Sequence, residues 1–333
     1  MLRFRVAPLC GAALLVVGLS ACGLPKHDEN SGAQVDIVAA GDSYSTGQGS
    51  AGAYYANGDG DAKSPDDPRT TWRQGTPVAG DLGCHRNHDA AAEQLWRETD
   101  SAGSFINASC SGDVIANLTG SNVPPQLNDF DVAQREDVEL ITITAGGNDL
   151  HFTSIVANCF FPGVAANGPC REQQDIALDL LDASGGKSQI QSQTQAALEH
   201  LGQQFPNALV VLIGYPLIFE GSSFVLPADT THAVFDPAAA ILDGIELLNS
   251  QQAQVVDDLN DSFGEKRFVF MPLHEDDNMG DFDGHGLGGA GQDFLNDLSA
   301  TPDSSEWVHP NAAGTAAMGD ALRDLPEVQA LFA

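Results

Sequence analysis

Short apolar segments that alternate with longer amphipathic segments constrain the fold of this chain more than any other feature. The apolar segments cover residues 35–40, 138–145, 208–214 and 267–271. Helical patterns cover residues 88–98, 188–204, 237–263 and 311–323. Short apolar runs are typical of strands in a parallel sheet that helices cover on both faces. The alternation therefore predicts one doubly wound α/β domain, and 333 residues, 42% of them apolar, suffice for its core.

The N-terminus carries the pattern of an export signal. Arg3 and Arg5 precede an apolar stretch at residues 6–19, which is too short to be a stable membrane span. A charged start, a short apolar core and small residues before a cleavage position are typical of a secretory signal peptide. We therefore expect export.

Small residues lead directly to a cysteine in the motif Leu-Ser-Ala-Cys at residues 19–22. This motif resembles the bacterial lipobox, in which the cysteine is lipidated; the alternative is an ordinary signal peptide with a chance cysteine. We expect a lipoprotein signal peptide at residues 1–21, a lipid on Cys22, a polar tether at residues 22–34 and the α/β domain at residues 35–333. The expected location is the cell surface or the periplasm, or outside the cell after release.

Four cysteines remain beyond the N-terminal segment: Cys84, Cys110, Cys159 and Cys170. An even number of cysteines in an exported chain suggests two disulfides. Three pairings exist, and joining sequence neighbours, 84 with 110 and 159 with 170, costs least. The chain has no Cys-x-x-Cys motif, which disfavours a zinc site. His85 and His88 could suggest a metal, but a solvated turn explains them better.

The charge of the chain is strongly negative. Lys and Arg number 14 against 46 Asp and Glu, a net charge of −32. Phosphate backbones are repelled by such a surface, which excludes nucleic acid as a partner. The acidity fits either solubility in high salt or solubility in general.

Residues that carry chemistry follow the apolar runs. Gly41-Asp42-Ser43 follows the first run, residues 146–149 (GGND) follow the second, and residues 306–310 (EWVHP) lie near the C-terminus. In parallel sheets, ligands bind at the carboxyl ends of the strands. A serine hydroxyl needs a base such as histidine to become a nucleophile, and the oxyanion that forms needs hydrogen-bond donors. These blocks together predict nucleophilic catalysis.

The order of these blocks resembles that of the SGNH, or GDSL-like, hydrolases, and most of all secreted actinobacterial lipases and esterases. A further block with a glycine is expected between the first two, and Cys110-Ser111-Gly112 fits it. The resemblance implies a flavodoxin-like three-layer α/β/α sandwich, disulfides between sequence neighbours and no cofactor. The Gly-x-Ser-x-Gly pentapeptide is absent, which argues against an ordinary α/β-hydrolase.

The resemblance also implies roles for individual residues. Ser43 would be the nucleophile and His309 the general base. The backbone N–H of Ser43, Gly112 and the Asn148 amide would form the oxyanion hole. A serine that must stand exposed at the end of a strand explains why the strand ends in a glycine-flanked turn.

The group that orients His309 departs from the family pattern. The family has Asp three residues before the histidine, and here that residue is Glu306. Asp303 is a second candidate, and a backbone carbonyl is a third alternative. The acidic loop at residues 275–291 could bind calcium, but its spacing does not match an EF-hand, so we expect a solvated loop and no metal.

These residues predict a serine esterase or lipase that hydrolyses carboxylic esters through an acyl-enzyme on Ser43. The alternatives are a polysaccharide acetyl-esterase and, in a different class, a cell-surface binding lipoprotein without activity. The expected partners are an ester substrate and, through the lipid on Cys22, a membrane; the chain is expected to be a monomer. Four apolar residues would line an acyl pocket or belong to the core: Phe152, Ile155, Phe160 and Phe161.

Overall fold

The computed structural model describes residues 34–52, 54, 84–100, 102–119, 126–127, 132–161, 165–221, 224–274, 282–298 and 306–333. The expected signal peptide with Cys22, most of the tether, Asp303 and residues 275–281 of the acidic loop lie outside the described residues. All statements below about the structure refer to the described residues.

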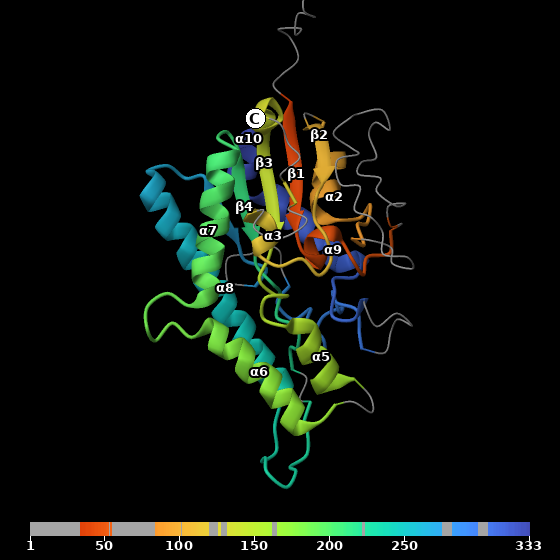
Figure 1. Ribbon diagram of the computed structural model, residues 1–333. Coiled ribbons are helices and arrows are strands. Elements are labelled where there is room, and N and C mark those ends of the chain that lie inside the picture. Colours follow the sequence, from red (N-terminus) through yellow and green to blue (C-terminus); the bar gives the residue numbers. More distant parts are fainter. Residues whose placement is uncertain are drawn as a thin grey trace, which may run out of the picture. The chain divides into compact units, whose positions relative to one another are not determined.

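A five-stranded parallel sheet forms the centre of the domain (Figure 1). Its strands are β1 (Val35–Gly41), β2 (Ala102–Asn107), β3 (Val138–Thr144), β4 (Leu209–Ile213) and β5 (Phe268–Met271). They are hydrogen-bonded in parallel in the order β2-β1-β3-β4-β5, which is the flavodoxin-like order. The predicted α/β class and flavodoxin-like fold are confirmed.

Ten helices are described. They are α1 (Ser43–Thr46), α2 (Ala91–Glu98), α3 (Ala116–Thr119), α4 (Val132–Asp137), α5 (Phe152–Phe160), α6 (Asn167–Leu181), α7 (Gln189–Gln204), α8 (Pro237–Phe263), α9 (Ala312–Asp324) and α10 (Pro326–Leu331). Helices α2 and α9 pack together on one face of the sheet, and α3, α7 and α8 cover the other (Figure 1). The sheet is therefore buried on both faces, which is why all five residues of β4 and most of β3 are apolar and inaccessible.

The four strands expected from apolar runs are present, with ends shifted by one residue at most. The edge strand β2 was not expected, because Ala102-Gly103-Ser104 lacks the continuous apolar character of the other strands. Its inner end is nevertheless buried, with Phe105 stacked on Trp96 of α2 at a ring-centroid distance of 5.5 Å. Helices α5 and α6 were not expected either.

Helices α5, α6 and the first half of α8 extend beyond the carboxyl ends of the strands (Figure 1). The disulfide Cys159–Cys170 joins α5 to α6, and the disulfide Cys84–Cys110 closes a second loop. Both expected pairings are confirmed. The helical extension creates a wall beside the end of the sheet at which the predicted site residues lie.

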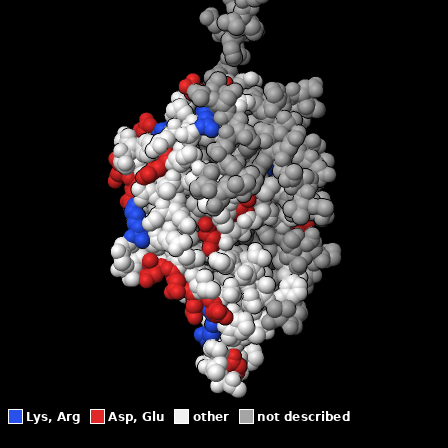
Figure 2. All heavy atoms as spheres, in the orientation of Figure 1, with Lys and Arg blue, Asp and Glu red and all other residues white. Residues whose placement is uncertain are grey.

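Acidic side chains gather along the flank formed by α6, α7 and α8 (Figure 2). The exposed acidic residues on α6 and α8 include Glu172, Asp175, Asp179, Asp243, Glu246 and Asp257. This flank therefore carries a negative electrostatic potential. None of the helices in the described part of the chain has the length and apolarity needed to cross a membrane.

Candidate active site

The turn after β1 presents Ser43 at the carboxyl end of the sheet. Gly41 ends the strand with a φ of +108°, and a Cβ at this position would lie 2.1 Å from the carbonyl oxygen of Thr144. Only glycine fits this position. Asp42 then caps the short helix α1, because its carboxylate accepts a hydrogen bond from the backbone N–H of Tyr44 at 3.0 Å. Ser43 is the first residue of that helix and is almost fully buried.

Asp42 is a buried anchor for this turn. Its carboxylate also accepts hydrogen bonds from the hydroxyl of Thr144, at 2.6 Å, and from the hydroxyl of Tyr215. Burial raises the pKa of Asp42 to about 6, although these hydrogen bonds lower it. The side chain therefore holds the turn against Thr144 of β3 and against Tyr215, which follows β4.

Ser43 and His309 lie in hydrogen-bonding contact. The Oγ of Ser43 is 2.8 Å from Nε2 of His309, and Nδ1 of His309 is 3.0 Å from the carbonyl oxygen of Trp307. A carbonyl only accepts, so Nδ1 carries the proton and Nε2 is left to accept the hydrogen bond from Ser43. Burial lowers the pKa of His309 to about 4, so the ring is neutral at pH 7. This pair has the geometry of a nucleophile and its base.

The loop that carries His309 is attached to the nucleophile turn. Tyr44, one residue after Ser43, donates its hydroxyl to the carbonyl of Val308 at 2.6 Å. Val308 has a φ of +58°, a left-handed conformation that a β-branched residue rarely adopts. The backbone of Asn296 accepts from Val308 N–H and donates to the carbonyl of His309, both at 2.9 Å. These contacts on both sides fix the position of the imidazole.

The expectation that Glu306 orients His309 is not met by the structure. The carboxylate of Glu306 accepts a hydrogen bond from the hydroxyl of Tyr54 at 3.0 Å. The backbone between Glu306 and His309 forms a tight turn, in which His309 N–H donates to the carbonyl of Glu306 at 3.2 Å. This turn places the Trp307 carbonyl, and not the Glu306 carboxylate, next to Nδ1 of His309. Of the three alternatives, the backbone carbonyl is the one that the structure shows.

Asn148 lies beside Ser43 and His309 in the same pocket. Its side-chain Nδ2 donates to the carbonyl of Asp113 at 2.9 Å, and the second hydrogen of this amide is available to a ligand. Asp113 directly follows Gly112, so this bond joins the two expected oxyanion blocks. Their role as oxyanion donors stays a prediction, and Gly112 is not among the residues that line the pocket.

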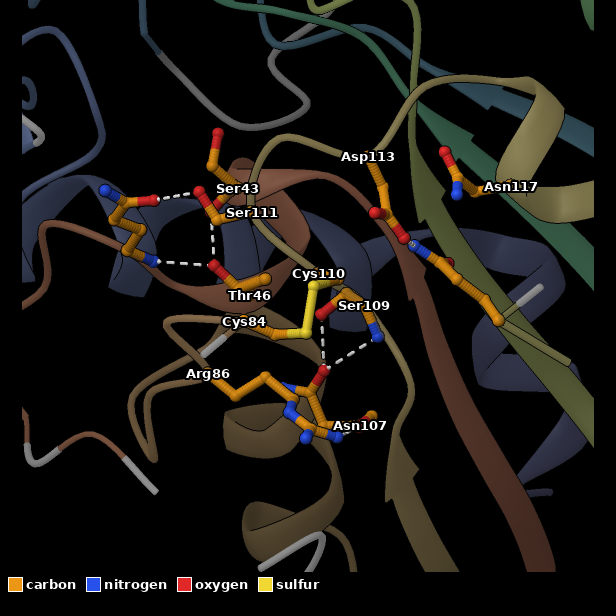
Figure 3. Close-up of a disulfide and its surroundings, with 12 residues drawn as sticks. Ser43, Thr46, Cys84, Arg86, Asn107, Ser109, Cys110, Ser111, Asp113 and Asn117 are labelled. Atoms are coloured by element: carbon orange, nitrogen blue, oxygen red, sulfur yellow. Dashed lines mark hydrogen bonds between the residues drawn. A yellow bond between two sulfur atoms is a disulfide. The ribbon is translucent and has the colours of Figure 1, made fainter. Parts of the chain in front are cut away.

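The loop of Cys110, Ser111 and Asp113 lies beside Ser43 (Figure 3). The hydroxyl of Ser111 donates to the side chain of Gln48 at 2.5 Å, and Ser111 N–H donates to the carbonyl of Cys84 at 3.1 Å. The disulfide Cys84–Cys110 closes the same loop. Gly112, with a φ of +82°, is thus held between two anchored neighbours.

Two buried polar side chains that complete the site were not found from the sequence. Tyr215 accepts a hydrogen bond from Gly147 N–H at 3.0 Å while its hydroxyl donates to Asp42, so it connects the turn of Ser43 to that of Asn148. It follows β4 at the carboxyl edge of the sheet, and this position was an available signal. Gln126 holds both backbone polar groups of Gly41, at 2.6 and 2.7 Å, and no motif marks it.

An apolar pocket opens beside Ser43 and His309. It contains about 810 Å³ of space free of protein atoms, its mouth included. Most of its wall comes from α5, α6 and α8, with Leu150 and Ile218 from the loops after β3 and β4. The apolar residues of the three helices are Phe152, Ile155, Ala177, Leu178, Leu181, Ala240, Ile241, Ile245 and Leu248. Of the four apolar residues singled out above, Phe152 and Ile155 line the pocket. Phe160 instead stacks on Phe219 in the core, and Phe161 is 37% exposed.

A parallel sheet in the flavodoxin-like order, with a buried serine in contact with a half-buried histidine at its carboxyl edge, places the protein among the serine hydrolases. The chain belongs to the GDSL-like lipase/acylhydrolase family, whose model matches residues 37–322, and it is a carboxylic ester hydrolase. The predicted family is confirmed.

Relatives support this family. The chain is 26% identical over 316 residues to lipase 1 of Streptomyces coelicolor, covering 94% of this chain and 95% of the relative. It is 27% identical over 241 residues to a lipase of Streptomyces rimosus, covering 71% of each.

Two solved structures share the fold. The extracellular lipase of Streptomyces rimosus matches with a TM-score of 0.60 at 20% identity, covering 89% of this chain and 99% of the other. Phospholipase A1 of Streptomyces albidoflavus also matches with a TM-score of 0.60, at 23% identity, covering 90% of this chain and 99% of the other.

Proposed function

We propose that the protein is an exported esterase or lipase that hydrolyses fatty-acyl esters through an acyl-enzyme on Ser43. The observation that carries this proposal is the 2.8 Å contact between Ser43 Oγ and His309 Nε2 at the end of an apolar pocket. A binding protein without activity would have no need of this contact. The lipase and phospholipase names of the relatives agree with an acyl substrate.

Acylation begins when Ser43 Oγ attacks the ester carbonyl carbon while His309 Nε2 takes its proton. The carbonyl oxygen becomes an oxyanion, which accepts hydrogen bonds from the Ser43 N–H, the Gly112 N–H and the Asn148 amide. The intermediate then collapses, the ester C–O bond breaks, and the alcohol leaves with the proton from His309. The acyl group stays on Ser43.

Deacylation repeats these steps with water. His309 takes a proton from a water molecule, the hydroxide oxygen attacks the acyl carbon, and Ser43 leaves with the proton that His309 returns. The free acid departs and Ser43 is regenerated. In both halves the Trp307 carbonyl keeps the proton on Nδ1, so the same nitrogen always faces the substrate.

Export and lipid anchoring are part of the proposal. The charged and apolar N-terminus and the Leu-Ser-Ala-Cys motif support both, and the disulfides fit an oxidising compartment. Expression of the full chain in bacteria, followed by fractionation, tests the anchor. The parent protein should be found in the membrane fraction, and the Cys22→Ser variant should be found in the soluble fraction. A Cys22→Ser variant that is still found in the membrane fraction would refute the anchor.

Hydrolysis of p-nitrophenyl esters of graded chain length tests the activity. The parent should turn over octanoate faster than acetate, since the pocket offers apolar contact to the longer chain. Ser43→Ala should lose about 10⁴-fold or more in kcat while its circular dichroism stays unchanged. Absence of ester turnover in the parent, or full turnover in folded Ser43→Ala, would contradict the proposal.

A further inference from the structure

Gly244 occupies an unfavourable place for glycine, since it lies within the long helix α8. Glycine inside a helix lowers helix stability relative to alanine, so an interior glycine needs a reason. Gly202 of α7 and Gly314 of α9 have one: a Cβ there would lie 2.8 Å from the Phe268 ring and 2.2 Å from the Phe294 carbonyl oxygen, respectively. At Gly244, a Cβ would meet no heavy atom within 4 Å, and the backbone is helical. Packing therefore does not require this glycine.

The space beside Gly244 belongs to the pocket that contains Ser43. Gly244 lines this pocket together with Ala240, one helical turn before it. Side chains on a helix point toward its N-terminus, so a larger residue at position 244 would cover Ala240 and fill the same space. The facing wall is α6, which contributes Ala177 and Leu178. Small residues on α8 thus leave room between the two helices.

Two hydrogen bonds, at different positions along the helices, fix the distance between α6 and α8. Near the start of α8, the amide of Gln174 on α6 donates to the carbonyl of Pro237 at 3.2 Å. Further along α8, the amide of Gln251 donates to the carbonyl of Leu181, the last residue of α6, at 2.7 Å. All four residues are buried. The helices are therefore fixed on either side of Gly244, and the space between them is a stable part of the pocket.

The position of the pocket relative to the reacting groups indicates which half of an ester it receives. Leu150, Phe152 and Ile155 follow Asn148 along the chain and line the pocket, whereas His309 is the only one of the described residues of its own loop, 295–298 and 306–311, that does so. The leaving alcohol must lie next to His309, which protonates it. The apolar wall on the Asn148 side is thus placed for the acyl chain.

We infer that the space beside Gly244 is the far subsite for an unbranched acyl chain, and that Gly244 sets the longest chain that the pocket accepts. This inference rests on the proposed function. Its chemistry is apolar burial alone, because each methylene that enters the subsite leaves water. Glycine at position 244 makes α8 less stable, but it leaves the subsite unfilled.

The test compares Gly244→Leu with the parent on p-nitrophenyl dodecanoate and butyrate. The readout is the ratio of kcat/KM for dodecanoate to that for butyrate. Each methylene excluded from an apolar site costs about fourfold, so loss of two to three methylenes should lower the ratio by about 15-fold to 60-fold. Gly185→Leu is the matched control, because Gly185 also has open space around it but lies in a turn away from the pocket. It should keep the ratio of the parent.

The outcomes separate this inference from the proposed function. An unchanged ratio in folded Gly244→Leu, or a parent that hydrolyses butyrate but not dodecanoate, overturns the subsite and leaves ester hydrolysis standing. A parent that hydrolyses neither ester overturns the proposed function, and the inference with it. Should Gly244→Leu fail to fold, Ala240→Leu places the same bulk in the same space, and its ratio decides under the same criteria.

Discussion

The carbonyl oxygen of Trp307 lies 3.0 Å from Nδ1 of His309, only two residues further along the chain. A backbone carbonyl orients the imidazole as a carboxylate does, but it carries no full charge. In the proposed mechanism, the imidazolium that forms during attack is stabilised by this dipole, and we expect activity not to depend on the ionisation of a third side chain. We therefore propose that Ser43 and His309 act as a dyad whose histidine is oriented by the backbone.

Glu306→Gln tests the dyad. In a triad, neutralising the carboxylate costs about 10⁴-fold in kcat, whereas we expect Glu306→Gln to cost less than about threefold. The amide oxygen of glutamine still accepts the hydrogen bond from Tyr54, so the loop should keep its structure. The measurement is the pre-steady-state rate of acylation by p-nitrophenyl butyrate, with His309→Ala as the inactive reference. If folded Glu306→Gln acylates a hundredfold or more slowly than the parent, the Glu306 carboxylate is the group that orients His309.

The pH dependence of kcat/KM reports the state of His309. The base must be neutral, so activity is lost as pH falls through the pKa of His309, which burial lowers to about 4. We expect a plateau from neutral pH down to about pH 5 and half of the activity at about pH 4. Circular dichroism at each pH shows that the fold persists over the range measured. A midpoint near the ordinary histidine value, about 6.5, would mean that the ring is far better solvated than the structure shows.

Tyr215→Phe tests whether the two turns of the site are positioned by one hydroxyl. The change removes the donor to Asp42 and leaves Gly147 N–H without its acceptor. We expect a stability loss of about 1–3 kcal/mol from these buried groups. We also expect a fall of roughly tenfold in kcat with little change in KM, because misplacement of reacting groups acts on the chemical step. A lower melting temperature with unchanged kcat would show that Tyr215 is only structural.

The two disulfides should differ in what they do for catalysis. Replacing both Cys84 and Cys110 with serine releases the loop that carries Gly112, and kcat should fall for esters of every chain length. Loop closure over 26 residues also contributes about 3.5 kcal/mol of stability. Replacing Cys159 and Cys170 is the matched control, because this bridge joins α5 to α6 and its loss should act mainly on the KM of long-chain esters. Identical effects of the two pairs would contradict this division.

Much of the fold could be predicted, because the burial of a strand on both faces leaves a continuous apolar run. β1, β3, β4 and β5 carry this signal, and it also located the sheet edge at which Ser43 and His309 meet. β2 lies at the sheet edge and begins with Ala-Gly-Ser, so no such run marks it. The other edge strand, β5, does carry an apolar run, so the sequence missed only the edge strand whose first residues are small or polar.

The candidate site could be predicted only where residue type carries the information. A serine and an asparagine after apolar runs, and a histidine before a proline near the C-terminus, are recognisable, but the Trp307 carbonyl is a backbone atom and could come from any residue. The position of Tyr215 after an apolar run was an available signal, but its hydrogen bonds to Asp42 and Gly147 become visible only in three dimensions, as does the open space beside Gly244. Glu306 was favoured because its type and spacing fit a triad, and the turn that directs it to Tyr54 becomes visible only in three dimensions.

Covalent labelling with an organophosphate measures the central claim, that Ser43 is a nucleophile activated by His309. Intact-protein mass spectrometry should show one adduct per chain, and fragmentation should place it on Ser43 rather than on Ser45, whose hydroxyl is hydrogen-bonded to Thr144 at 2.8 Å. Ser43→Ala should take up no label, and folded His309→Ala should react at least about a hundredfold more slowly. An adduct on another serine, or labelling of His309→Ala at the rate of the parent, would contradict the account.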